Sequence, residues 1–361
     1  MADELPGGFL TLSDLEEAAS KNVLEPAWAY VQGGAGEELA MKANREAFQR
    51  RTLRPRALVN VETLELTTIL LKEKVSAPFY ISPTAYQGLL HPDAELATAR
   101  AASSANVLAI FSTISSRSLE EIAQAAPTGP RWFQLYLQPE NATTQRLVER
   151  ADKAGYTALV LTVDAPVFGN RDKTILGGFN VSSIPLGNGR DVFPPTHPTL
   201  HGQLYHTRSE ASATWDALDK LRKLTHLPFL VKGILTPEDA QHALDHGVEG
   251  IIVSNHGGRQ LDQAQASLDA LPEIVETVGS KVEVYLDGGI RRGSDVLIAL
   301  AMGARAVGLG RPVLWALAAG GEAGVARLLS LLKEDLAITM ALTGRRTLAE
   351  VDRTLLGPPR L

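Results

Sequence analysis

The feature that most constrains the fold is a series of eight short apolar runs, each followed by a polar or ionisable residue. Such runs are typical of buried parallel strands, and helical patterns fill the sequence between them. Eight strands that alternate with helices match the number that closes a barrel, whereas a doubly wound sheet usually has fewer. We therefore predict an α/β protein with a TIM (β/α)8 barrel. The predicted strands are Phe79–Ser82, Leu108–Ser112, Trp132–Tyr136, Ala158–Val163, Phe229–Val231, Gly250–Val253, Val282–Leu286 and Ala306–Leu309.

The chain is predicted to form one domain over residues 1–361, because 361 residues with 45% hydrophobic content can bury one large core. An N-terminal segment from Ser13 to about Phe48 has a helical pattern, and we expect it to cover the bottom or the side of the barrel. Residues 172–215 lose the alternation and contain scattered glycines and prolines. Long irregular insertions in compact domains are often functional. We therefore predict an active-site lid after the fourth strand, with a plain surface excursion as the alternative.

The composition excludes several kinds of site and partner. The chain has no cysteine, which excludes disulfides, thiolate metal ligands and cysteine nucleophiles, and we predict no metal site. A net charge of −6 argues against nucleic-acid binding, which needs a basic surface. No apolar run is long enough to span a bilayer, and the first residues lack the pattern of a secretory signal. We expect a cytoplasmic protein with no membrane or nucleic-acid partner.

Polar residues at the strand ends predict a site at the carboxyl edge of the barrel, where the functional loops of this fold lie. Gln134 and Tyr136 share one strand face, as do Thr162 and Asp164, so each pair should point into the barrel mouth. Lys232 ends the run FLVK. A lysine there is compatible with a Schiff-base nucleophile, a charge stabiliser beside a cofactor, or a structural ion pair.

The segment SNHGGRQLD, which starts at Ser254, carries a candidate base and a candidate anion-binding group. His256 lies in a glycine-rich turn after a strand, where an imidazole can act as a base near neutral pH. Asp164 can orient that ring, and Arg171 and Arg259 suit a planar carboxylate. Together these residues predict proton abstraction from an anionic substrate.

The last two strands are followed by glycines and arginines in the motifs LDGGIRRG and GLGRP. Barrels commonly bind phosphate at this place, beside helix amino termini and glycine backbone. A phosphate there and a flat ring above Lys232 fit flavin mononucleotide (FMN).

Eight motifs spread over nearly the whole chain resemble one family of flavoenzymes. They are RPR at Arg54–Arg56, PTAYQ from Pro83, WFQLY from Trp132, LTVDAP from Leu161, VKG from Val231, SNHGGRQLD from Ser254, DGGIRRG from Asp287 and GRP from Gly310. With these motifs the chain resembles the FMN-dependent 2-hydroxy-acid oxidases and dehydrogenases, which include glycolate, lactate and hydroxymandelate oxidases. It is most similar to the bacterial L-lactate oxidase-like members.

The resemblance implies a role for each residue at the strand ends. FMN would be held by Pro83, Thr84, Ala85, Ser112, Gln134, Thr162, Lys232, Ser254, Asp287, Gly288, Gly289, Arg291, Gly310 and Arg311. The catalytic residues would be His256, Asp164, Tyr136 and Lys232, with Lys232 stabilising charge on the reduced flavin. The substrate would be bound by Tyr30, Tyr136, Arg171, Arg259 and Ile114.

The implied reaction is oxidation of an L-2-hydroxy acid to the 2-keto acid, with O2 reduced to H2O2. Ile114 stands where the glycolate oxidase pattern has tryptophan. A smaller residue reshapes the pocket, which favours lactate, with mandelate-type or longer substrates as the alternative. A dehydrogenase that uses another electron acceptor is a further alternative.

Three other interpretations are considered: a phosphosugar isomerase, an FMN-dependent isomerase, and a catalytically silent ligand-binding barrel. The isomerases leave Arg171, Arg259 and His256 without a use, and the intact set of ionisable residues argues against a silent barrel. The family resemblance also implies a homotetramer.

Overall fold

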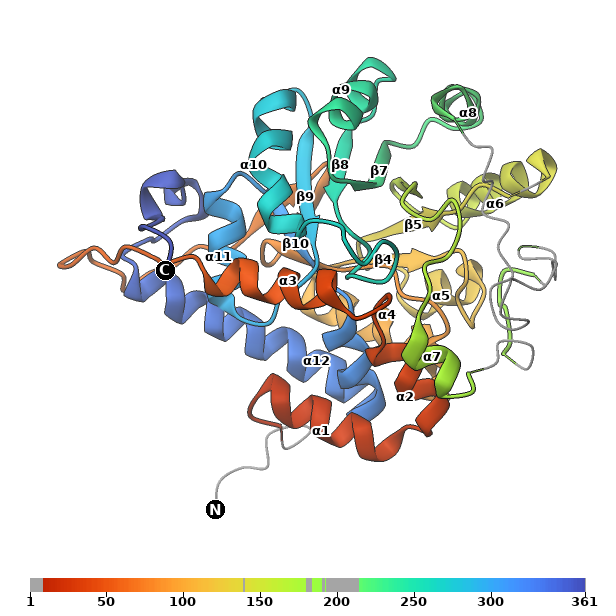
Figure 1. The fold of residues 1–361 in the computed structure, drawn as a ribbon, viewed down its shortest axis with the longest axis horizontal. Helices are drawn as coiled ribbons and strands as arrows, with labels where there is room; N and C mark the ends of the chain where they lie inside the picture. The colour runs from red at the N-terminus through yellow and green to blue at the C-terminus, as the bar shows by residue number, and fades with distance from the viewer. Residues whose placement is uncertain (1–8, 139, 180–183, 190–191, 193–213, 361) are drawn as a thin grey trace.

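The computed structural model contains a closed barrel of eight parallel strands, surrounded by helices (Figure 1). It describes residues 9–138, 140–179, 184–189, 192 and 214–360. The barrel order is β10-β3-β4-β5-β6-β7-β8-β9. Its strands are β3 (Phe79–Ile81), β4 (Leu108–Ser112), β5 (Arg131–Leu135), β6 (Leu159–Thr162), β7 (Phe229–Ile234), β8 (Gly250–Val253), β9 (Glu283–Asp287) and β10 (Ala306–Leu309). The predicted fold class is confirmed, and each predicted strand overlaps an observed one.

Helices cover the outside of the barrel and its carboxyl end. The α-helices are α1 (Leu12–Asn22), α2 (Glu25–Gln32), α3 (Leu39–Gln49), α4 (Ala94–Ala105), α5 (Leu119–Ala125), α6 (Asn141–Lys153), α7 (Asp172–Leu176), α8 (Trp215–Arg222), α9 (Pro237–Asp245), α10 (Ser267–Val278), α11 (Gly293–Ala301) and α12 (Arg311–Leu342). Short 3₁₀ turns are η1 (Gln87–Leu89), η3 (Leu348–Glu350) and η4 (Arg353–Leu355). A kink at Gly320 and Gly321 divides α12, because neither glycine has helical dihedral angles.

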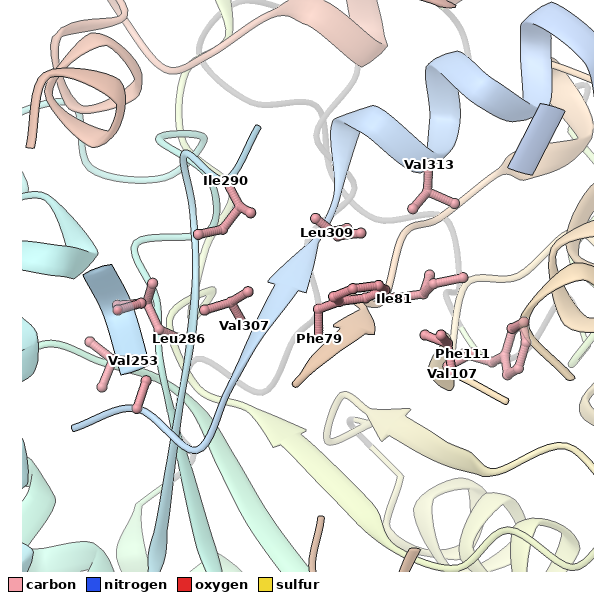
Figure 2. Close-up of a cluster of buried hydrophobic side chains, with 14 of the residues drawn as sticks. Phe79, Ile81, Val107, Phe111, Val253, Leu286, Ile290, Val307, Leu309 and Val313 are labelled. Carbon is pink, nitrogen blue, oxygen red and sulfur yellow. The ribbon is translucent and has the colours of Figure 1, made fainter. Parts of the chain in front are cut away.

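Alternate residues of each strand separate the core into two layers. In β3, Phe79 and Ile81 belong to the layer between strands and helices, whereas Tyr80 belongs to the barrel interior. Figure 2 shows part of the outer layer, which contains side chains from several strands and Val313 of α12. This alternation follows from the two-residue period of a strand, and it directs the polar residue after each strand toward the rim.

A short hairpin that is not among the predicted elements closes the amino end of the barrel. Strands β1 (Thr68–Leu70) and β2 (Glu73–Val75) pair antiparallel. Leu70 and Val75 are fully buried against the interior layer. The hairpin was missed because its turn starts at Leu71, which has a positive φ of 51°, instead of the glycine or asparagine that usually marks such turns.

The N-terminal helices do not cover the bottom of the barrel, which corrects one of the two expectations for this segment. Helix α1 packs on α12 at the side. Its N-cap is Thr11, whose hydroxyl accepts from the Asp14 N–H. Helices α2 and α3 lie instead at the carboxyl rim, where Asn44 of α3 exchanges two hydrogen bonds with Asn255 after β8.

The hairpin makes a testable contribution to stability. Substitution of Leu70 by alanine should lower the free energy of unfolding by about 2–5 kcal/mol, because it leaves a cavity in the barrel interior. Urea denaturation measures this change. The neighbouring Ile69→Ala is the control, since Ile69 is 50% exposed, and should change stability by less than about 0.5 kcal/mol. Equal effects of the two substitutions would contradict the assigned packing.

Candidate active site

A cavity of about 400 Å3 opens at the carboxyl ends of the barrel strands. Almost every site residue predicted from the sequence lines it. These are Tyr30, Pro83, Thr84, Ala85, Ser112, Ile114, Gln134, Tyr136, Thr162, Arg171, Lys232, His256, Arg259, Asp287, Gly288, Gly289, Arg291, Gly310 and Arg311. Asp164 and Ser254 lie directly behind this lining, where they bind His256 and Lys232.

The His256 imidazole is fixed from two sides. The backbone of His256 adopts a left-handed conformation with φ of 58°, and its backbone N–H donates to the Ser254 hydroxyl over 3.0 Å. The ring Nδ1 lies 2.8 Å from Asp164 Oδ1. With Nδ1 engaged by the carboxylate, Nε2 is the ring nitrogen left to accept a proton in the cavity.

The protonation states in this pair follow from burial and charge. Burial lowers the pKa of His256, and this effect outweighs the opposing influence of Asp164. Burial alone would raise the pKa of Asp164, but the nearby His256 and Lys232 lower it below its ordinary value. The site therefore contains a neutral imidazole that can take a proton, beside a carboxylate that can stabilise the resulting cation.

Lys232 is a buried cation held between two carboxylates. Its Nζ lies 3.4 Å from Asp287 Oδ2 and 4.0 Å from Asp164 Oδ2, and it donates to the Ser254 hydroxyl over 2.9 Å. Burial by itself would lower the pKa of Lys232, but the two carboxylates raise it above its ordinary value. A lysine that stays protonated supplies positive charge to the cavity and is a poor Schiff-base nucleophile.

Four arginines add further positive charge to the cavity wall. They are Arg171, Arg259, Arg291 and Arg311, whereas Asp287 is the one acidic side chain among the described lining residues. Burial and the proximity of the other three guanidinium groups hold the pKa of Arg311 well below its usual range. Arg311 also donates to the carbonyls of Val31, Gly33 and Gly257, so it attaches α2 to the rim. Such an excess of buried and half-buried cations favours a ligand with several negative charges.

Glycines after β9 and β10 bring backbone close to the cavity. Gly289 has a φ of 89°, and a Cβ there would lie 2.4 Å from the Asn44 carbonyl oxygen. A Cβ on Gly310 would instead enter open space. Gly310 is the N-cap of α12, and the lining glycines after β9 precede α11. The amino terminus of α12 therefore lies at this side of the cavity, an arrangement that binds phosphate.

One buried donor and one buried acceptor on the cavity wall have no partner among the described residues. The Gln134 side-chain oxygen accepts from Ser112 and Thr113, but Nε2 donates to nothing in this part of the chain. The Oδ1 atom of Asp287 is likewise unpartnered there. Because such atoms are costly to bury alone, the cavity suits a ligand that carries both acceptors and donors.

The opposite side of the cavity is apolar. Ile114, Tyr136 and Ala165 form a separate buried cluster, against which Ala85, Tyr86 and Leu186 pack. Ile114 lies just beyond the end of β4, not within the strand. Tyr30 stacks on Phe179 with ring centroids 4.4 Å apart, and both rings lie close to Tyr86. Burial raises the pKa of Tyr136, which keeps its hydroxyl protonated as a hydrogen-bond donor.

The predicted lid is described only in part. Residues 180–183, 190–191 and 193–213 lie outside the described residues, and the prediction that residues 172–215 close over the site stays a prediction. Its described parts contribute Thr174, Phe179, Ile184 and Leu186 to the cavity lining. The sequence did not predict these contacts because the segment has no helical or strand period from which to infer orientation.

Comparisons with known proteins agree with this arrangement. A family model described as FMN-dependent dehydrogenase matches residues 19–358. L-lactate oxidase from Nostoc sp. is 45% identical over 358 residues, which cover 96% of this chain and 98% of that protein. Human (Homo sapiens) 2-hydroxyacid oxidase 2 is 44% identical over 353 residues, which cover 98% and 99%. A crystal structure of mandelate oxidase superposes with a TM-score of 0.88 at 40% identity, and covers 98% of this chain and 99% of that one.

The pKa of His256 can be measured in the folded protein. We expect its imidazole to titrate below the ordinary value of about 6.5, because burial disfavours the charged ring. Heteronuclear NMR on histidine-labelled protein measures the midpoint, and the signal lost in His256→Asn identifies the resonance. A midpoint above the ordinary value would show that Asp164 outweighs burial and that the resting ring is charged.

Proposed function

Because the chain belongs to the family of FMN-dependent dehydrogenases, we propose that it oxidises an L-2-hydroxy acid to the 2-keto acid, while O2 is reduced to H2O2. Lactate is the favoured substrate. The observation that carries the proposal is the pairing of His256 with Asp164 beside five cations in one cavity. This set provides a base, a carboxylate-binding group and a site for an anionic cofactor. A phosphosugar isomerase would not need all three.

The cavity residues fit FMN on three structural grounds. The cationic wall suits the phosphate, the unpartnered Gln134 Nε2 and Asp287 Oδ1 suit a ring with acceptors and donors, and Gly310 leaves open space beside a helix amino terminus. The residues proposed to hold FMN are Pro83, Thr84, Ala85, Ser112, Gln134, Thr162, Lys232, Ser254, Asp287, Gly288, Gly289, Arg291, Gly310 and Arg311. When bound, FMN supplies the two-electron oxidant that no side chain of this chain can supply.

The protein supplies the proton chemistry and the charge. We propose that Nε2 of His256 takes a proton from the substrate, and that Asp164 stabilises the imidazolium that forms. Lys232 places a permanent positive charge at the ends of β7 and β9, where it can stabilise negative charge that develops next to it. The tightly held geometry keeps the base in one orientation, which reduces the entropic cost of reaching the transition state.

The substrate carboxylate is proposed to bind between Arg171 and Arg259. Arg171 is buried, and the Arg259 guanidinium lies 4.8 Å from the centre of the Tyr30 ring, so both groups are held in place before substrate binds. Tyr30 and Tyr136 line the same part of the cavity and can donate hydrogen bonds to substrate oxygens. A carboxylate held this way directs the 2-hydroxyl group toward His256.

Two observations bear on the substrate side chain. The similarity to L-lactate oxidase favours a short side chain. The apolar cluster around Ile114 and the likeness to mandelate oxidase favour a larger or aromatic one as the second candidate. An acceptor other than O2 is a further alternative. A homotetramer and a cytoplasmic location are part of the same proposal. No helix in the described part of the chain is long and apolar enough to cross a membrane.

The proposed function predicts a colour change. Purified protein should be yellow and should lose its visible absorbance when it is mixed anaerobically with L-lactate or a related L-2-hydroxy acid. When air is admitted, the absorbance should return and H2O2 should form. His256→Ala should keep FMN bound but reduce it at least about 100-fold more slowly, because the proton acceptor is lost. Stopped-flow absorbance with a panel from lactate to mandelate measures both effects and the substrate preference.

The matched control is His226→Ala, because His226 is exposed and lies just before β7, at the amino end of the barrel. It should be reduced at the wild-type rate. If wild-type protein binds FMN but the flavin is not reduced by any L-2-hydroxy acid, the proposed function is wrong. Ordinary reduction of His256→Ala would remove the base assignment alone.

A further inference from the structure

The side-chain amide of Gln260 joins two loops of the site, although Gln260 is not among the residues that line the cavity. Its Oε1 accepts from the Gly169 N–H over 3.3 Å and from Arg171 Nη2 over 3.0 Å. Its Nε2 donates to the carbonyls of Asp164, over 3.1 Å, and of Val167, over 2.9 Å. One amide therefore makes four hydrogen bonds to the segment between Asp164 and Arg171.

This segment approaches the loop after β8 so closely that side chains are excluded between them. A Cβ on Gly169 would lie 2.2 Å from the Gln260 carbonyl oxygen and 2.7 Å from its Cα. Arg171 Nε also donates to the carbonyl of Arg259, over 3.1 Å. The segment that starts at Asp164 and ends at Arg171 is thus attached directly to the loop that carries His256 and Arg259.

The charge of the contact matters as much as its geometry. Arg171 donates to a backbone carbonyl and to an amide oxygen, which are both neutral, and the described residues include no carboxylate in an ion pair with it. Arg171 is 5% exposed as a residue, and its guanidinium lies 5.5 Å from the centre of the Phe168 ring. A neutral acceptor can orient this cation without neutralising it, whereas a glutamate in the same place would form an ion pair with it.

We propose that Gln260 is a positioning residue for substrate binding: it fixes the Arg171 guanidinium toward the cavity with a neutral acceptor, so that the positive charge stays available for the substrate carboxylate. The same amide holds the Asp164 backbone, so the group that orients His256 and the group that binds the carboxylate keep a constant separation. The inference rests on the proposed function, because it takes a 2-hydroxy acid as the ligand.

The test compares a charged ligand with its uncharged analogue in the FMN-loaded protein. Pyruvate carries a carboxylate, and pyruvamide replaces it with a neutral amide. Each is titrated into wild-type protein and Gln260→Glu, and the dissociation constant is read from the change in visible flavin absorbance. Gln260→Glu should weaken pyruvate binding at least about tenfold, because Arg171 is then paired within the protein, and should change pyruvamide binding less than about twofold.

The matched control is Gln265→Glu, which makes the same substitution in the same loop. Gln265 is exposed, and its side chain donates to the carbonyl of Leu235 instead of to the segment that carries Arg171. This variant should bind both ligands as the wild type does. A comparable loss of pyruvate binding in Gln265→Glu would mean that the added charge acts at long range, which would overturn the proposal.

Two results with Gln260→Glu would also overturn the proposal: unchanged binding of pyruvate, or equal weakening of pyruvate and pyruvamide, which is what general damage to the loop produces. If Gln260→Glu does not fold, Gln260→Met serves instead. It should weaken pyruvate binding more than pyruvamide binding, because Arg171 loses the acceptor that orients it, and equal effects would exclude the role. Failure of wild-type protein to oxidise any 2-hydroxy acid would be a separate result, against the proposed function.

Discussion

Four ionisable side chains form a continuous row across the carboxyl end of the barrel: Asp287, Lys232, Asp164 and His256. Asp287 ends β9, Lys232 lies within β7, Asp164 follows β6, and His256 lies in the loop after β8, so the row crosses four consecutive strands, β6 to β9. All four groups are largely buried, and Lys232 is the cation that compensates the two carboxylates, so its removal leaves both of them uncompensated, a loss that costs about 3–5 kcal/mol in comparable buried pairs. This mutual dependence fixes the position of the base and of the lysine with respect to the barrel.

The two ends of the barrel differ: the amino end contains packed apolar side chains, and the carboxyl end contains the ionisable residues of the site. At the amino end, the β1–β2 hairpin buries Leu70 and Val75 against the interior aromatic residues. At the carboxyl end, the row of charges is surrounded by segments that hydrogen-bond to one another across long sequence distances. Helices α2 and α3 belong to this second group, because Arg311 binds the carbonyls at the end of α2 and Asn44 binds Asn255. The N-terminal segment is therefore a structural part of the site.

The sequence predicted the barrel and most of the site because both depend on local patterns. A parallel strand buried on both faces is a continuous apolar run, and the residue after it lies at the rim wherever the barrel closes. Features that arise from tertiary contacts were not predictable in this way. The position of α3 depends on contacts that are distant in sequence, such as an amide pair separated by 211 residues, and the contacts of Phe179 and Leu186 come from an irregular segment. Gln260 belonged to a recognised motif, but its four partners became evident only in three dimensions.

The concentrated positive charge of the cavity is matched, under the proposed function, by the negative charge of the FMN phosphate. The most direct measurement is the free energy of unfolding of the apoprotein, determined by urea denaturation without ligand, with FMN, and with riboflavin, which has the same ring but no phosphate. A ligand that binds only the folded state stabilises it in proportion to its affinity. FMN should raise the free energy of unfolding by several kcal/mol more than riboflavin at equal concentration. Equal stabilisation by the two flavins, or none by either, would contradict the binding of the FMN phosphate by the cationic cavity wall.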